Sequence, residues 1–297
     1  MNIVNIFISS LSLSAPLLFA AMGCLIMQKA GILNFGVDGV MILGGLSYAI
    51  VIKQYLFLGD NICFLGFFLA FVIGMGLGLI HAVLTISLKT NQFLVSFIWN
   101  YLALGLSSLI LIFNYGQRTL DAYEIFIAPI FIGYPLSLVF IFNVILILFV
   151  SSFFFLTRMG LYFKAAGKNA VVLTLSQINV VKIRYLAVIV GFGLIALGGA
   201  FFTNQKGTFD VSVNNIGLIA FAIVALSQWA VFRSVFFTYL VTILLEFSGF
   251  LRQDNNKWWW TILPYVLQLL IAPLFALYEK NDRMPKMLNT PYTKGKG

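Results

Sequence analysis

Charged residues are scarce in this chain of 297 residues, which has only 9% Asp, Glu, Lys and Arg but 61% hydrophobic residues. Soluble domains carry roughly 25% charged residues, enough to cover a surface that faces water. This chain has too few charged residues to form such a surface, and its 31 phenylalanines are a further argument against a soluble fold. We therefore expect lipid to surround most of the protein, with no sizeable domain outside the membrane.

Residues that bind metals or form disulfides are also few. The chain has two cysteines, Cys24 and Cys63, without CxxC spacing, and a single histidine, His81. They supply neither a metal-ligand set nor a disulfide framework. Gly167-Lys168 lacks the upstream glycine and the following Ser or Thr of a phosphate-binding loop, and the sequence has no Ser/His/Asp set or HExxH motif. We expect a chain that is not an enzyme and carries no cofactor of its own.

Nine hydrophobic runs are long enough to cross a membrane, at roughly 20 residues per helix. They lie near 5–27, 32–52, 62–87, 93–113, 136–156, 185–203, 215–231, 235–251 and 258–278. Pro16 interrupts the first run and the seventh is short, so the expected number of spans is eight to ten. The first residues lack the basic region of a signal peptide, so we expect the first span to be retained. The sequence predicts an all-α, polytopic transmembrane helix bundle, a single domain over 1–297 with a tail over 279–297.

Lys and Arg are distributed unevenly among the connections. With the amino terminus outside, thirteen of the 18 basic residues fall on the inner side and five on the outer side. The positive-inside rule therefore predicts an outer amino terminus and an inner carboxyl terminus. This distribution also explains the net charge of +9 without any binding of nucleic acid.

The largest inner connection covers 157–184 and carries five basic residues but no acidic one. It is too polar to cross the membrane. Its middle part, from Lys164 to Ser176, is amphipathic, so we expect a short helix lying on the inner surface. An ordinary solvated loop would explain the same charges.

Polar side chains within the hydrophobic runs need partners, because a charge at the centre of a span costs roughly 2.5–3.5 kcal/mol. Asp38 follows Asn34 by four residues, which places both on one helical face, and glycines flank Asp38 as in the discontinuous helices of transporters. A structural hydrogen bond between helices, or a position wetted from the cytoplasm, would also explain Asp38. Asn100 either joins helices or lines a pathway, and His81 is either a buried hydrogen-bonding group or a proton relay.

Two polar turns lead into similar hydrophobic runs, GILNFGVDGV at 31–40 and FDVSVNNIGL at 209–218. The offset of five spans reverses the orientation of the second run. The pattern predicts an inverted repeat of two four-helix halves, about 1–113 and 185–278, with a pathway between them. Small residues at Gly74, Gly76 and Gly78 and over 193–199 predict closely packed helices.

Five blocks of the sequence resemble a known family and together cover most of the chain. They begin with APLLFAAMGCLIMQKAGILNFGVDGVMILGG and continue at 74–108, 157–202, 214–226 and 258–273. The resemblance is to the permease subunits of bacterial ABC importers, in the branch that serves nucleosides, riboflavin and simple sugars with basic-membrane-lipoprotein-type binding proteins. Asp38 stands where this family usually has Glu. The Asp-Leu-Ser-Val-Gly pattern of ribose-type permeases is absent, which favours a nucleoside or riboflavin over a monosaccharide.

The resemblance also implies roles for individual residues. In such permeases the segment matching 157–184 carries a coupling helix that docks on a separate ATPase. The corresponding residues here are Gly160, Lys164, Ala165, Gly167, Lys168 and Asn169. Lys168 stands where the family usually has Glu, and Leu226-Ser227-Gln228 replaces an aromatic–Gly pair. Asn34, Asp38 and Asn100 are the candidates for the substrate pathway.

What the resemblance implies is one permease subunit of an ATP-driven importer in the bacterial inner membrane. Its expected partners are a second permease subunit, with a heterodimer favoured, two ATPase domains that hold ATP and Mg, and a lipoprotein binding protein outside. A proton-coupled secondary transporter with Asp38 and His81 as proton sites is the alternative. A purely structural membrane protein would explain the hydrophobicity but neither the inverted halves nor the basic loop.

Overall fold

Helices dominate the computed structural model, which describes residues 3–55, 62–122, 129–131, 134–211, 215–255, 266 and 284–290. The helices are α1 (Ile3–Leu13), α2 (Ala15–Lys29), α3 (Val37–Tyr55), α4 (Ile62–Ala82), which continues into a π-helical turn (Val83–Ser87), α5 (Gln92–Tyr115), α6 (Val139–Leu156), α7 (Arg158–Lys168), α8 (Ala170–Leu175), α9 (Val180–Lys206), α10 (Ile216–Leu226) and α11 (Val231–Asn255). The strands are β1 (Thr119–Asp121), β2 (Pro129–Phe131), β3 (Tyr134–Ser137) and β4 (Thr208–Asp210).

Six helices in the described residues are long and apolar enough to cross a membrane, and a seventh span results if the bent pair α1–α2 counts as one. The predicted number of nine is therefore not reached in this part of the chain. The run at 215–231 gives only the short helix α10, and all but one residue of the run at 258–278 lies outside the described residues. The chain is nevertheless a polytopic helical membrane protein, as predicted.

The first span bends by 46° between α1 and α2. The bend falls at Ser14, and Pro16 stands in the first turn of α2, where its missing N–H group breaks no helical hydrogen bond. The second predicted span begins late, at Val37, because residues 32–35 form no helix. Both differences arise where a hydrophobic run continues through a backbone break that hydrophobicity alone does not reveal.

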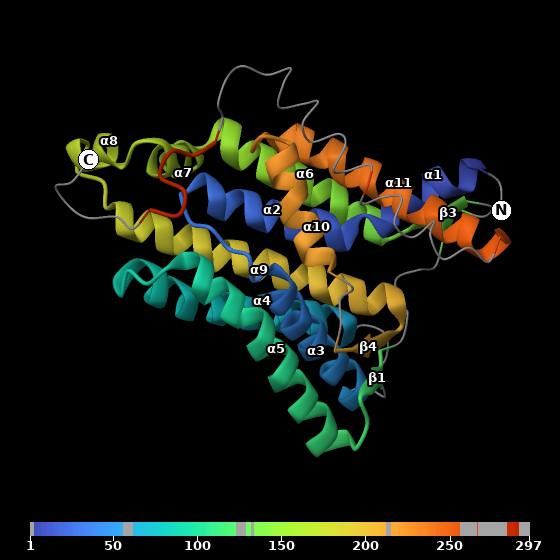
Figure 1. The fold of residues 1–297 in the computed structure, drawn as a ribbon. Coiled ribbons are helices and arrows are strands. Elements are labelled where there is room, and N and C mark those ends of the chain that lie inside the picture. Colours follow the sequence, from blue (N-terminus) through green and yellow to red (C-terminus); the bar gives the residue numbers. More distant parts are fainter. Residues whose placement is uncertain are drawn as a thin grey trace.

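Helix α9 lies at the centre of the bundle, where α2, α3 and α4 pack around it (Figure 1). Small residues make this packing possible. A Cβ atom on Gly199 would collide with the carbonyl oxygen of Met41, and one on Gly74 would lie 2.7 Å from that of Phe192. The close packing predicted from the glycines is thus confirmed at these positions, whereas Gly76 has open space around it.

Two small antiparallel sheets were not predicted by the all-α interpretation. Strand β1 pairs with β4, with Leu120 opposite Phe209, and β2 pairs with β3. Strands β1, β3 and β4 lie at the end of the molecule opposite α7 and α8 (Figure 1). The β1–β4 pairing therefore joins the connection after α5 to the connection after α9.

The connection predicted as one helix from Lys164 to Ser176 contains two helices instead, α7 and α8. They separate at Asn169, whose backbone is extended and whose side chain accepts a hydrogen bond from the N–H of Val171 at 3.1 Å. This contact caps α8, and Thr157 caps α7 in the same way. The predicted helix boundary was therefore wrong because an asparagine cap was not recognised.

Candidate functional site

The chain between α2 and α3, residues 30–36, is a non-helical segment inside the helix bundle. Non-helical backbone in a membrane protein requires hydrogen-bond partners from the protein or from a water-filled cavity, because lipid offers none. Here much of the pairing comes from α5. Three polar side chains spaced by four residues, those of Gln92, Ser96 and Asn100, lie on one face of that helix and contact the segment.

The first two of these side chains hold Leu33. The N–H group of Leu33 donates to the Gln92 side-chain oxygen at 2.8 Å, and the Ser96 hydroxyl reaches the Leu33 carbonyl oxygen at 3.4 Å. Gln92 directly follows Asn91, whose side chain caps the start of α5. The Asn-Gln turn therefore positions both the helix and the segment that the helix supports.

Asn100 uses both ends of its amide. Its oxygen accepts from the N–H of Gly39 at 2.8 Å, and its nitrogen donates to the carbonyl oxygen of Phe35 at 3.2 Å. The adjacent carbonyl of Trp99 would collide with a Cβ on Gly39, so α5 and α3 are in direct backbone contact. Of the two roles considered for Asn100, the structure shows the joining of helices; its role in a pathway stays a prediction.

Asp38 connects the starts of two helices. It lies in the first turn of α3, is 8% exposed, and accepts a hydrogen bond from the N–H of Gly217 at 2.7 Å. Gly217 is in the first turn of α10, where the positive end of the helix dipole favours a carboxylate. This is the structural hydrogen bond that the sequence left open as an alternative. It brings together the two segments whose similarity suggested an inverted repeat, although the repeat itself stays a prediction.

Asn34 is almost completely buried, at 1% exposure, and its side-chain oxygen accepts from the N–H of Gly36 at 2.8 Å. The side-chain nitrogen has no hydrogen-bond partner among the described residues. Asn34 thus shapes the turn into α3, close to the contacts made by Asp38 and Asn100. Asn34 and Asp38 therefore belong to one region, which we call the α2–α3 break and define as residues 30–39, and Asn100 contacts this region from α5.

His81 is fully buried and accepts a hydrogen bond from the indole nitrogen of Trp99 at 3.1 Å through its Nδ1 atom. The proton of the neutral ring is then on Nε2, which has no hydrogen-bond partner among the described residues. Phe192 packs against the imidazole ring, at 4.9 Å between centroids. His81 is thus a buried hydrogen-bonding group with only one of its two ring nitrogens paired, and the described part of the chain contains no metal-ligand cluster.

The end of α7 contacts the end of α2 closely. A Cβ on Gly167 would collide with the carbonyl oxygen of Lys29, and Gly31 has a φ of 88°, a conformation that favours glycine. The short segment 284–290 adds to the contact, because the N–H of Met287 donates to the carbonyl oxygen of Gly167 at 2.9 Å. Helix α7 is therefore packed directly against the start of the α2–α3 break.

The residues that the family resemblance assigns to coupling differ in their exposure to solvent. Gly160 and Gly167 are buried within the protein, and Gly160 packs against the backbone of α6. Lys168 and Asn169 are exposed, while Lys164 and Ala165 are half-buried. Burial and the neighbouring Lys168 lower the pKa of Lys164, whose ammonium group donates to the carbonyl oxygen of Phe154 at 2.8 Å. Only the exposed residues of this set are available to a partner without rearrangement.

Two contacts escaped the sequence interpretation. Arg184 was counted only as an inner basic residue, but it is 1% exposed and donates to the carbonyl oxygens of Thr290 and Ala166 at 3.1 and 3.4 Å. The indole nitrogen of Trp229 donates to the side-chain oxygen of Gln28 at 2.6 Å, joining the connection after α10 to the end of α2. The polar stripe on α5 had a detectable signal in its spacing of four; these two contacts had none.

Comparison with known proteins identifies the family. The profile described as branched-chain amino acid transport system / permease component matches residues 6–272. The guanosine ABC transporter permease protein NupQ of Bacillus subtilis is 26% identical over 318 residues, covering 97% of this chain and 96% of that protein. The nucleoside ABC transporter permease protein NupC of Lactococcus lactis is 25% identical over 311 residues, covering 95% and 98%.

A further relative is named for a sugar. The putative glucose ABC transporter permease protein TsgC13 of Haloferax volcanii is 30% identical over 245 residues, covering 77% of this chain and 72% of that protein. No solved structure matches the chain. The matches confirm the resemblance to ABC importer permeases, which are non-catalytic transport subunits. The chain therefore belongs to the family of branched-chain amino acid transport system permease components, and it is a multi-pass membrane protein.

Proposed function

We propose that the chain is the permease subunit of an ATP-driven importer for nucleosides. The observation that carries this proposal is the similarity to two nucleoside permeases over at least 95% of both chains. The glucose-named relative covers less of the chain, and none of the three relatives described above is named for riboflavin. A nucleoside is therefore favoured over the riboflavin and simple-sugar alternatives.

Aromatic side chains on α5 support a substrate with a planar ring. Phe93, Phe97 and Tyr101 are exposed and form a series with ring centroids 5.9 and 5.4 Å apart. Phe35 of the α2–α3 break lies 5.1 Å from the Phe93 ring. A nucleobase stacks favourably on such rings, worth roughly 1–3 kcal/mol per base in other proteins. Glucose has no aromatic ring and gains less from this surface.

The contacts of α7 suggest how ATP hydrolysis on a partner would act on this chain. Helix α7 packs on the end of α2, and the α2–α3 break leads from there to Asp38, which holds the start of α10. A displacement of α7 would thus be carried through closely packed backbone to the starts of α3 and α10. Contiguous packing of this kind is one physical means of coupling between two sites.

The assembly follows from this role. Two permease subunits, favoured as a heterodimer, would enclose the pathway in the bacterial inner membrane, and two ATPase domains would hold ATP and Mg and contact Lys168 and Asn169 from the cytoplasm. A lipoprotein binding protein would deliver the solute outside. The pathway would then run beside Asn34, Asp38 and Asn100, with rigid-body motion of the subunits opening it to one side at a time.

The proton-coupled alternative is less well supported. Asp38 already accepts a hydrogen bond from α10, and His81 accepts one from Trp99. His81 would have to break that contact to take a proton on Nδ1, whereas Asp38 could take one on its second carboxylate oxygen. No hydrogen bond joins the two side chains to each other, so a relay would need a link that the described residues do not provide.

Uptake measurements test the solute directly. Vesicles containing this chain, its permease partner, the ATPases and the binding protein would be supplied with labelled guanosine and ATP, with glucose and riboflavin as competitors. We expect excess unlabelled guanosine to block uptake and the two competitors to leave it nearly unchanged. Strong inhibition by glucose or riboflavin, with weak inhibition by nucleosides, would overturn the assignment.

A variant sharpens the same test. Phe97→Leu removes one ring of the α5 series and should raise the KM for guanosine about tenfold, from the size of one stacking contact. The matched control is Phe149→Leu, on the exposed face of α6, which should leave the KM unchanged. Equal effects of the two variants would show that the α5 rings do not contact the solute.

A further inference from the structure

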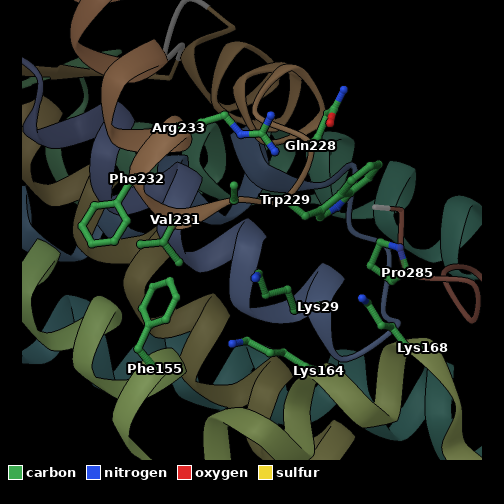
Figure 2. A pocket seen from close by; sticks show the side chains of 11 residues that line it. Lys29, Phe155, Lys164, Lys168, Gln228, Trp229, Val231, Phe232, Arg233 and Pro285 are labelled. Carbon is green, nitrogen blue, oxygen red and sulfur yellow. The ribbon is translucent and has the colours of Figure 1, made fainter. Parts of the chain in front are cut away.

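A cavity of about 470 Å³ opens between α7, the end of α2 and the first turn of α11. Four basic residues line it: Lys29 from α2, Lys164 and Lys168 from α7, and Arg233 from α11. The described lining residues include no Asp or Glu. Figure 2 shows the three lysine side chains entering the same space below the first turn of α11. Basic side chains from three helices therefore share one cavity.

Two of these lysines lie over aromatic rings at the end of α6. The ammonium of Lys29 lies 4.8 Å from the centre of the Phe154 ring, and that of Lys164 lies 5.0 Å from the Phe155 ring. The lowered pKa of Lys164 has burial and Lys168 as its causes, so these cations oppose one another. The lysines at the ends of α2 and α7 are partly offset by the negative ends of those helices.

The first turn of α11 adds donors to the same space. Residues 231–233 line the cavity, and the first backbone N–H groups of an α-helix have no partner within their own helix. Together with the cations, they form an environment suited to an anion with several oxygen atoms, such as a phosphate. Arg233 brings a guanidinium group, whose planar donors match phosphate oxygens.

The mouth of the cavity is apolar. Phe155 of α6 and Phe232 of α11 are 62% and 60% exposed, and their rings stack with centroids 5.7 Å apart. Figure 2 shows the two rings together at one side of the cavity, with the basic groups beside them. Both belong to the exposed apolar faces of helices long enough to cross a membrane. The cavity therefore joins a lipid-facing surface to a basic interior.

We propose that this cavity, the basic pocket, binds the phosphate headgroup of an anionic phospholipid, whose acyl chains lie against Phe155 and Phe232. The cytoplasmic leaflet contains anionic lipids, and basic pockets between transmembrane helices on that side are suited to them. The inference rests on the predicted inner position of α7 but not on the identity of the transported solute. A bound lipid would brace α11 against α7 and α2, the elements that the proposed coupling movement displaces.

Lipid binding to the full-length permease tests the proposal. The protein, purified in detergent, would be titrated with phosphatidylglycerol or with phosphatidylcholine of the same acyl chains, and bound lipid would be counted by native mass spectrometry. We expect preferential binding of phosphatidylglycerol. The double variant Lys168→Gln/Arg233→Gln should weaken that binding about 25-fold, since each basic residue near an anionic surface contributes about fivefold.

The matched control removes two basic residues from the same predicted inner side but outside the pocket. Lys89→Gln/Lys182→Gln changes two exposed lysines and should leave phosphatidylglycerol binding nearly unchanged. If the double pocket variant does not fold, Lys168→Gln alone, at an exposed position, should still weaken binding about fivefold. Equal binding of both lipids, or equal effects of pocket and control variants, would overturn the proposal.

Two further experiments distinguish the lipid from other sources of negative charge. Glycerol 1-phosphate carries the headgroup phosphate without acyl chains, and we expect it to compete poorly. Competition as strong as that of the lipid would show that a soluble phosphate is the ligand and would overturn the lipid assignment. Adding the ATPase partner should leave the lipid in place; its complete displacement would instead assign the pocket to acidic residues of the ATPase.

Discussion

Two interruptions of the helical bundle differ in how their polar groups are satisfied. In the α2–α3 break, Gln92, Ser96 and Asn100 of α5 pair with the backbone, and Asp38 pairs with the start of α10. In the connection between α10 and α11, residues 228–230 line the basic pocket, which is open and has four basic residues in its lining. Most polar groups of the first interruption are paired within the chain, whereas the second borders an open basic cavity. In the proposed mechanism, α7 receives the movement and the break transmits it.

The largest effect is expected where α7 meets the break. Gly167→Leu places a side chain against the carbonyl oxygen of Lys29, and overpacking of this kind costs about 1–3 kcal/mol or more. Transport should be abolished and the thermal unfolding midpoint lowered. The control is Gly76→Leu on α4, where a Cβ has open space and both properties should be retained. Normal transport by the Gly167 variant would mean that this contact is dispensable.

Removal of the carboxylate at Asp38 should have the next largest effect. Asp38→Leu leaves the N–H group of Gly217 without its acceptor, a loss of about 1–3 kcal/mol for a buried donor. Asp38→Asn keeps an oxygen that can accept the same hydrogen bond and should retain most of the stability. Thermal unfolding of the two purified variants measures the difference. Equal destabilisation by both would show that the charge, not the hydrogen bond, matters at this position.

The candidate site shows which features could be predicted from the sequence and which could not. Asn34, Asp38 and Asn100 were recognisable because polar side chains are unusual in apolar runs, and the long spans were recognisable from their hydrophobicity. The partner of Asp38 was not, because Gly217 is 179 residues away and one glycine N–H resembles any other. The charge distribution predicts an inner position for Arg184, but its burial against α7 depends on the tertiary packing of segment 284–290.

Lys168, an exposed residue with a proposed role in coupling, should affect transport but not stability. Lys168→Glu restores the charge that the wider family usually has at this position, and the side chain is exposed, so folding should be unchanged. We expect uptake to fall severalfold when the chain is paired with its own ATPase, because the contact would then carry the wrong charge. Uptake and unfolding are measured on the same preparation. A parallel loss of stability would place Lys168 with the structural residues instead.

The smallest effect concerns pH. The pKa of Lys164 is lower in the folded protein than in the unfolded chain, so the unfolded chain binds more protons in the range between the two values. Stability should therefore rise slightly with pH across that alkaline range. Lys164→Gln removes this contribution, so the difference in unfolding midpoint between wild type and variant should change with pH in that range only. A pH-independent difference would contradict the burial of this ammonium group.

The energy source of uptake tests the central claim most directly. A permease that is driven through α7 depends on a separate ATPase. In vesicles that contain the chain and its partners, uptake would be followed with ATP held constant while a protonophore collapses the proton gradient, and again with the gradient intact but without ATP. We predict that uptake continues in the first condition and stops in the second. Uptake that continues without ATP and stops with the protonophore would contradict the account and favour a proton-coupled carrier that uses Asp38 and His81.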